Sequence, residues 1–132
     1  MKIILGVLLV AHGLVHVGLA AAPNPADPDT KPLAFFTTVD RSWLFSRIGM
    51  TPNSVKWIGL ILVGLATLGF ILAGIGILSS GGLNTIWRPC AAFSSVISLL
   101  LLVLFWHPWL PVGILIDLAA LAVIIWNKFP EV

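Results

Sequence analysis

The chain has 132 residues, of which 59% are hydrophobic and 9% are charged, and its formal net charge is +2. Globular domains in water carry about 25% charged residues, so this composition excludes a water-soluble domain and indicates a protein that faces lipid. The single cysteine excludes an internal disulfide framework and a cysteine-rich metal site. We therefore predict an all-α integral membrane protein with a single domain.

Four stretches between the charged residues are candidates for membrane spans. A transmembrane helix needs roughly 20 mostly apolar residues to cross about 30 Å of hydrocarbon. The predicted spans lie at about 3–22, 57–78, 89–106 and 110–126, and the last is the shortest. Most of the tryptophans lie near a predicted span end, and tryptophan concentrates at membrane interfaces. The expected fold is an antiparallel bundle of four transmembrane helices.

The first stretch also has features of a secretory signal. Lys2 precedes the apolar run, and small residues precede Pro23. The apolar region of a signal peptide has about 7 to 15 residues, whereas this run is longer and contains two histidines. We therefore interpret it as the first span.

The long loop, 23–56, is predicted to lie at the membrane surface. Its proline-rich first part cannot sustain a helix. In its second part, Asp40 can cap a short amphipathic interfacial helix over residues 41–48. Leu44 and Ile48 lie one turn apart in that helix, so we expect both to point into lipid.

The other connections are short and set the order of the helices. Thr51 and Pro52 form an N-cap and a first helical position, which predicts that the helix of the second span begins there. Residues 79–85 form a tight, glycine-rich loop. The turn at His107 and Pro108 is tighter still, so the third and fourth spans should be antiparallel neighbours.

The basic residues give little information about orientation, because those flanking the two sides of the membrane are nearly equal in number. Lys2, directly beside the first span, favours both termini in the cytoplasm. We expect the protein in the cell or inner membrane. The pI of about 9.1 does not indicate a nucleic-acid partner, because the basic residues are scattered and form no patch.

Small residues mark the faces through which the spans pack. In the second span they form a stripe at heptad spacing, which comprises Gly59, Ala66, Gly69, Ala73 and Gly76. Small residues let two helix backbones approach closely in lipid. The stripe can therefore contact another helix of this chain or a second copy, and other membrane subunits are further candidate partners.

Asp117 is the only charged residue inside a predicted span. A carboxylate at such a depth costs roughly 2.5 to 3.5 kcal/mol on insertion scales. Gly113 and Ala120 lie on the same face of the fourth span, which predicts that Asp117 faces the bundle interior. There it must be protonated, hydrogen-bonded or paired.

The three histidines are predicted to lie on the same side of the membrane as Asp117. His16 and Asp117 each lie six residues inside one boundary, about 9 Å deep at 1.5 Å per residue. His12 lies one turn below His16, level with Ser98. His107 lies at the rim, below the segment that contains Arg41. The candidate binding residues are His12, His16, Ser98, His107, Asp117 and Arg41.

The i, i+4 spacing of His12 and His16 leaves several chemistries open. Two imidazoles on one helix face can chelate a metal, or one can ligate haem while the other carries protons. The same rings can instead hydrogen-bond to Asp117 and Ser98 and hold the bundle together without a ligand. For His107, an interfacial turn and a ligand role are both open.

Gly6 and Gly13 are seven residues apart, and His12 directly precedes Gly13. In these features the segment 4–16 resembles the first helix of DoxX-like membrane proteins, a family of small four-helix proteins with a His-Gly-x-x-Lys element. His16 stands where that element has lysine, so no role is carried over to it. The resemblance implies association with membrane redox complexes, in which some members are quinone-linked subunits.

Three functions from different classes fit these features. The first, which we favour, is a non-catalytic accessory or binding subunit whose pocket of His12, His16 and Asp117 holds a quinone, haem or lipid. The second is a small proton- or ion-coupled transporter in which Asp117 titrates. The third is a membrane-embedded metal enzyme with His12, His16 and either His107 or Asp117 as ligands of an open zinc site.

Overall fold

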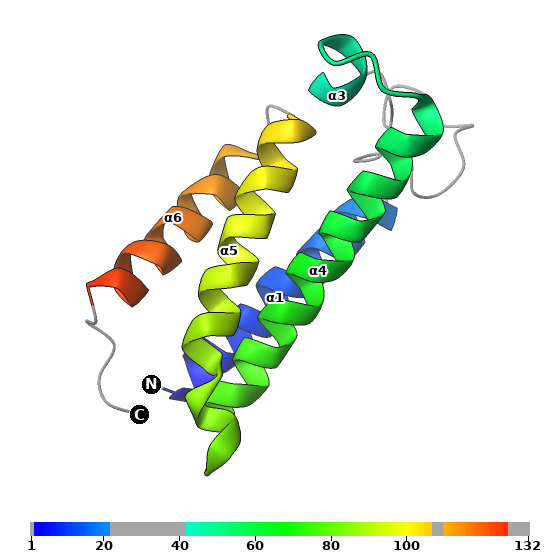
Figure 1. Ribbon diagram of the computed structural model, residues 1–132. Helices are drawn as coiled ribbons and strands as arrows, with labels where there is room; N and C mark the ends of the chain where they lie inside the picture. Colours follow the sequence, from blue (N-terminus) through cyan, green and yellow to red (C-terminus); the bar gives the residue numbers. More distant parts are fainter. Residues whose placement is uncertain (1, 22–41, 107–109, 127–132) are drawn as a thin grey trace.

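The structure is a computed structural model that describes residues 2–21, 42–106 and 110–126. These residues are helical or in turns, without a strand, which confirms the all-α class. Figure 1 shows the helices arranged along one another. They are α1 (Lys2–Ala21), α3 (Trp43–Ser46), α4 (Pro52–Leu78), the 3₁₀ helix η2 (Gly82–Thr85), α5 (Trp87–Leu104) and α6 (Pro111–Ile125).

Three of the helices are long and apolar enough to cross a membrane. The mean hydropathy of their most apolar windows is 2.3 in α1, 2.5 in α4 and 1.7 in α5. The fourth, α6, has only 15 residues, which gives it a length of about 22 Å at 1.5 Å per residue. The expectation of a membrane protein is therefore supported by three helices, and α6 is a shorter apolar helix beside them.

The helices pack in chain order, with α1 along α4, α4 along α5 and α5 along α6 (Figure 1). Glycines bring α1 and α4 close together. A Cβ added to Gly74 would lie 2.7 Å from the carbonyl oxygen of Gly6, and one added to Gly13 would lie 2.9 Å from Cβ of Phe70. The hydroxyl of Thr67 also donates to the carbonyl of Gly13, at 3.0 Å. The two backbones therefore touch along this interface.

The stripe of small residues in α4 is buried within the chain. Ala66 and Ala73 have no exposed surface, and Gly59 is buried as well. Gly69 packs against Ser94 of α5, and Gly76 packs against η2 and the start of α5. The stripe thus serves the packing of helices within this chain.

The start of α4 follows the predicted capping pattern. The side chain of Thr51 accepts a hydrogen bond from the backbone N–H of Ser54, at 3.3 Å, and Pro52 takes the first helical position. The helix therefore begins five residues before the predicted span at Trp57. This early start confirms the cap and lengthens α4 to 27 residues.

The predicted interfacial helix is shorter than expected, and its lipid-facing residues were assigned incorrectly in part. Only α3 is helical there, and Gly49, with φ of 72°, follows it. Ile48 is exposed, but Leu44 is 8% exposed and belongs to an apolar cluster with Ala20 and Val55. The backbone folds back, since the N–H of Met50 donates to the carbonyl of Leu44. Leu44 is therefore directed onto the end of the bundle. Asp40 and Arg41 lie outside the described residues.

Trp87 lies at the start of α5, near a predicted span end, but its side chain faces the protein interior. It is 4% exposed and packs in an apolar cluster with Ala73, Ile77 and Ala91. Gly76 leaves the space that the indole fills, because a Cβ there would lie 3.0 Å from Cβ of Trp87. Trp106 and Trp126, in contrast, are 45% and 70% exposed, as expected of interfacial residues.

Candidate functional site

Asp117 is the only buried residue of α6, and it faces α1 and α5. Its Oδ1 lies 3.0 Å from Nε2 of His12. Its Oδ2 lies 2.5 Å from the hydroxyl of Ser98. Both oxygens of this buried acid therefore have hydrogen-bond partners, one on each neighbouring helix, which offsets the cost of burying the group.

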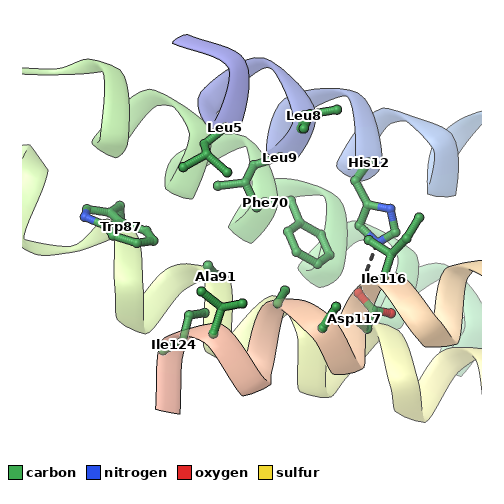
Figure 2. Close-up of a pocket in the computed structure, with 13 residues that line it drawn as sticks. Leu5, Leu8, Leu9, His12, Phe70, Trp87, Ala91, Ile116, Asp117 and Ile124 are labelled. Carbon is green, nitrogen blue, oxygen red and sulfur yellow. Dashed lines mark hydrogen bonds and ion pairs between the residues drawn. The ribbon is translucent and has the colours of Figure 1, made fainter. Parts of the chain in front are cut away.

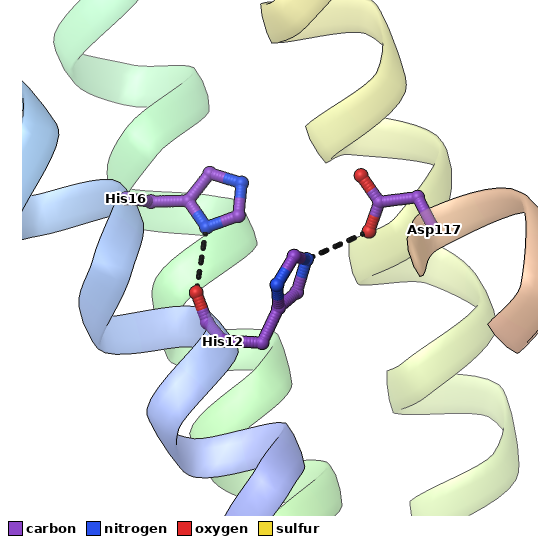
Figure 3. Close-up of side chains that lie close together, drawn as sticks. All are labelled: His12, His16 and Asp117. Carbon is purple, nitrogen blue, oxygen red and sulfur yellow. Dashed lines mark hydrogen bonds and ion pairs between the residues drawn. The ribbon is translucent and has the colours of Figure 1, made fainter. Parts of the chain in front are cut away.

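His16 extends this arrangement into a continuous set of hydrogen bonds. Its Nδ1–H donates to the carbonyl oxygen of His12 at 2.9 Å, and its Nε2 lies 2.7 Å from the Ser98 hydroxyl. Figure 3 shows the two rings and the carboxyl group converging from α1 and α6. We refer to His12, His16, Ser98 and Asp117 as the polar network. It joins three helices.

The helix α4, which has no residue in the polar network, contributes an aromatic ring to this region. The ring of Phe70 meets that of His12 edge to face, with centroids 4.8 Å apart, and stacks on that of His16 at 6.0 Å. The two histidine rings are themselves 5.0 Å apart and nearly perpendicular. Phe70 therefore fixes the orientation of both imidazoles from the side opposite α6.

The structure brings together four of the six candidate residues. The depth count anticipated that they could reach one another, but it placed His16 level with Asp117 and His12 level with Ser98. The observed contacts run the other way, from His12 to Asp117 and from His16 to Ser98. Counting along each helix treats the helices as vertical rods, whereas real helices are tilted by different amounts. Arg41 and His107 lie outside the described residues.

A cavity of about 290 Å³ lies between α1 and α6, with α4 and α5 at its base. Figure 2 shows His12 and Asp117 at one end of it and Trp87 at the other. Apart from His12 and Asp117, the lining is aliphatic or aromatic. The remaining lining residues are Leu5, Leu8, Leu9, Phe70, Ala91, Ile116, Ala119, Ala120, Val123 and Ile124.

On the other side of the polar network the bundle is closed by an apolar cluster. Ala20 lies one turn beyond His16, and Leu101 and Leu102 lie one turn beyond Ser98. These residues pack with the cluster that Leu44 and Phe105 also join. The polar network is therefore open toward the cavity and sealed toward α3.

The polar network also contains a group of residues that could hold a metal ion. The ligand atoms of His12, His16 and Asp117 lie within 4.8 Å of one another. Three of the four imidazole nitrogens are engaged in hydrogen bonds. A metal or haem iron would bind either at Nδ1 of His12 or after hydrogen bonds are broken.

Several residues that shape the site were not anticipated from the sequence. Phe70 is an aromatic residue in the middle of a stripe of small residues, and that exception could have marked it. The lining residues Leu5, Leu9 and Ile124 carry no such signal, because apolar residues at a lipid-facing surface and around a cavity look alike.

No family model, curated protein or solved structure matches this chain.

Proposed function

We propose that this chain is a small integral membrane protein that binds a quinone-class molecule in the cavity between α1 and α6, as a non-catalytic binding or accessory subunit. The observation that carries the proposal is the cavity itself, which is apolar along its length and ends at a hydrogen-bonded imidazole and carboxyl group. A quinone has the matching form, since its apolar ring and tail suit the lining and its ring carbonyl oxygens can accept hydrogen bonds. Ligand sites commonly combine an apolar lining with a few convergent polar groups.

The size of the cavity and the exposure of the residues at its opening indicate what kind of ligand fits it. Its volume of about 290 Å³ is at the lower end of the about 300 to 1,000 Å³ typical of ligand pockets, which suits a head of one or two rings. Leu8 and Ile116 line the cavity and are 59% and 47% exposed. A ligand with an apolar tail can thus enter from the lipid and leave its tail there.

The resemblance of the first helix to DoxX-like proteins supports the same proposal. That resemblance implies association with a membrane redox complex, in which quinones are common reactants. The outer face of α6 also fits a partner in the bilayer, since Val112 and Leu115 on it are 65% and 66% exposed. We propose this face as the contact for other membrane subunits or for lipid.

We further propose that α6 is a fourth span and that both ends of the chain lie in the cytoplasm. Gly113 packs against Leu102 near the end of α5, and Ile124 lines the cavity together with Trp87 at the start of α5. α6 therefore runs along most of α5. A short helix can span by thinning the bilayer locally.

The four-span proposal predicts that a fluorescent protein fused to the C-terminus fluoresces in the cytoplasm, while a periplasmic alkaline phosphatase fused there is inactive. A fusion to the loop after α1 should give the reverse result. If phosphatase is active at the C-terminus and inactive after α1, the orientation is inverted. If the two fusion sites report the same side, the number of spans is wrong.

The binding proposal predicts that a short-chain ubiquinone analogue quenches the fluorescence of the purified protein in lipid nanodiscs, because Trp87 lines the cavity. Ala120→Leu places a larger side chain in the cavity and should weaken binding at least tenfold. Ala122→Leu is the matched control on the same helix, and it should bind as the wild type does because Ala122 does not line the cavity.

Three results would contradict the proposal. Equal binding by the Ala120→Leu and Ala122→Leu variants would place the probe elsewhere. Saturable binding of a fatty acid, with no competition from the quinone analogue, would identify the cavity as a lipid site. Quenching that survives Trp87→Phe unchanged would likewise exclude a position beside the indole.

A further inference from the structure

The polar network contains three side-chain contacts, and each of them needs one proton between its two heavy atoms. They join His12 to Asp117, Asp117 to Ser98, and Ser98 to His16. The Nε2–H of neutral His12 donates to Asp117. The single hydroxyl proton of Ser98 can be donated either to Asp117 or to His16, but not to both. A third proton must therefore reside on Asp117 or on His16.

The tautomer of His16 defines where that proton can be. Its Nδ1 faces the carbonyl oxygen of His12, which only accepts, so Nδ1 carries a proton. Its Nε2 is then an acceptor in the neutral ring and a donor in the imidazolium. Two arrangements satisfy all three contacts. Either Asp117 is a carboxylic acid and His16 is neutral, or Asp117 is a carboxylate and His16 is an imidazolium.

We propose that Asp117, Ser98 and His16 form a proton relay that holds one exchangeable proton, with the Ser98 hydroxyl as the carrier. The O–H bond of the acid breaks as its proton passes to Oγ of Ser98. The original hydroxyl proton of Ser98 passes to Nε2 of His16 in the same exchange. Asp117 becomes a carboxylate, His16 becomes an imidazolium, and the hydroxyl is restored, so the number of protons and the total charge are unchanged.

Among the described residues, His12 is the one further titratable group that contacts this relay. Phe70 of α4, which packs against both imidazole rings, is uncharged, and so is Thr67 of the same helix. The hydroxyl of Thr67 is already bound to the carbonyl of Gly13. Beyond His16 the apolar cluster seals the bundle. Within the part of the chain that the structure describes, the open route for a proton is from the cavity side, through Asp117 or His12. The relay is then a local proton store rather than a path across the membrane.

The relay is tested on the ligand-free protein in nanodiscs, so its outcome is independent of quinone binding. Infrared spectroscopy measures the protonated fraction of Asp117 from its carboxylic C=O band, which Asp117→Asn identifies by its loss. Nitrogen NMR of labelled histidine measures the imidazolium fraction of His16. In the wild type the two fractions should add to one at neutral pH, and as temperature changes one should fall as the other rises. A sum of zero would overturn the proposal.

Variants separate the carrier role of Ser98 from simple packing. Ser98→Thr keeps a hydroxyl and should keep the two fractions complementary. Ser98→Ala should abolish this complementarity, so that Asp117 and His16 titrate independently. Ser95→Ala is the matched control, because Ser95 is equally buried one turn away and its hydroxyl has no partner among the described residues. Complementary fractions in Ser98→Ala would exclude the hydroxyl as the carrier.

Discussion

Replacing Asp117 with alanine is expected to destabilise the bundle by about 1 to 3 kcal/mol, whereas asparagine at the same position should preserve close to wild-type stability. Alanine removes the acceptor for His12 and the partner of Ser98 at once. Asparagine supplies an oxygen to accept from His12 and an N–H to donate to Ser98, whose hydroxyl can then donate to His16. In the asparagine variant each of the three contacts of the polar network therefore still has one proton between its heavy atoms, although the titratable acid is gone.

The comparison is made by reversible unfolding of both variants in mixed detergent micelles, followed by tryptophan fluorescence. Ser95→Ala serves again as a control for the loss of a buried polar atom that has no partner in the described part of the chain. If alanine and asparagine give the same stability, hydrogen bonding by Asp117 does not hold α6 in place. In that case the polar network would contribute to function alone.

A second large effect is expected from Gly74→Leu, which should destabilise the bundle by more than about 3 kcal/mol. Even the first carbon of the new side chain would lie 2.7 Å from the carbonyl oxygen of Gly6 and 2.5 Å from Cγ2 of Val10. The obstruction at Gly6 is backbone and cannot rotate away, so α1 would have to separate from α4.

Gly64→Leu provides the matched control on the same helix, because a Cβ at Gly64 meets nothing within 4 Å. Thermal unfolding in detergent should leave this variant near the wild type and lower the midpoint of the Gly74 variant by many degrees. Equal midpoints for the two variants would show that α1 and α4 do not depend on their backbone contact.

The sequence was informative wherever a residue was an exception to its surroundings. A charged residue within an apolar span identified Asp117, and the i, i+4 spacing placed His12 and His16 on one face. The cap at Thr51 was predicted equally well, because a hydroxyl-bearing residue followed by proline is typical of a helix N-terminus. Each of these signals is local, so it needs no knowledge of how the helices are tilted.

The remaining features depend on contacts between helices that are far apart in the chain. Nothing in the composition of the first span and of the last indicates that a cavity separates them, because lipid and a cavity favour the same side chains. The burial of Leu44 and Trp87 within the protein was not predicted, for the same reason. An apolar residue at a membrane boundary can turn to the lipid or to the protein, and only the shape of the neighbouring helices decides between the two.

The burial of Asp117 alone in α6 also bears on how the protein is made. Isolated in lipid, this helix would expose a carboxyl group with no partner, which opposes its insertion. With His12 and Ser98 already in place, the same group finds both of its hydrogen bonds. The order of synthesis meets this requirement, since α1 and α5 leave the ribosome first. If α6 is the fourth span proposed above, the residue that marks the site thus also makes the entry of α6 into the bilayer depend on α1 and α5.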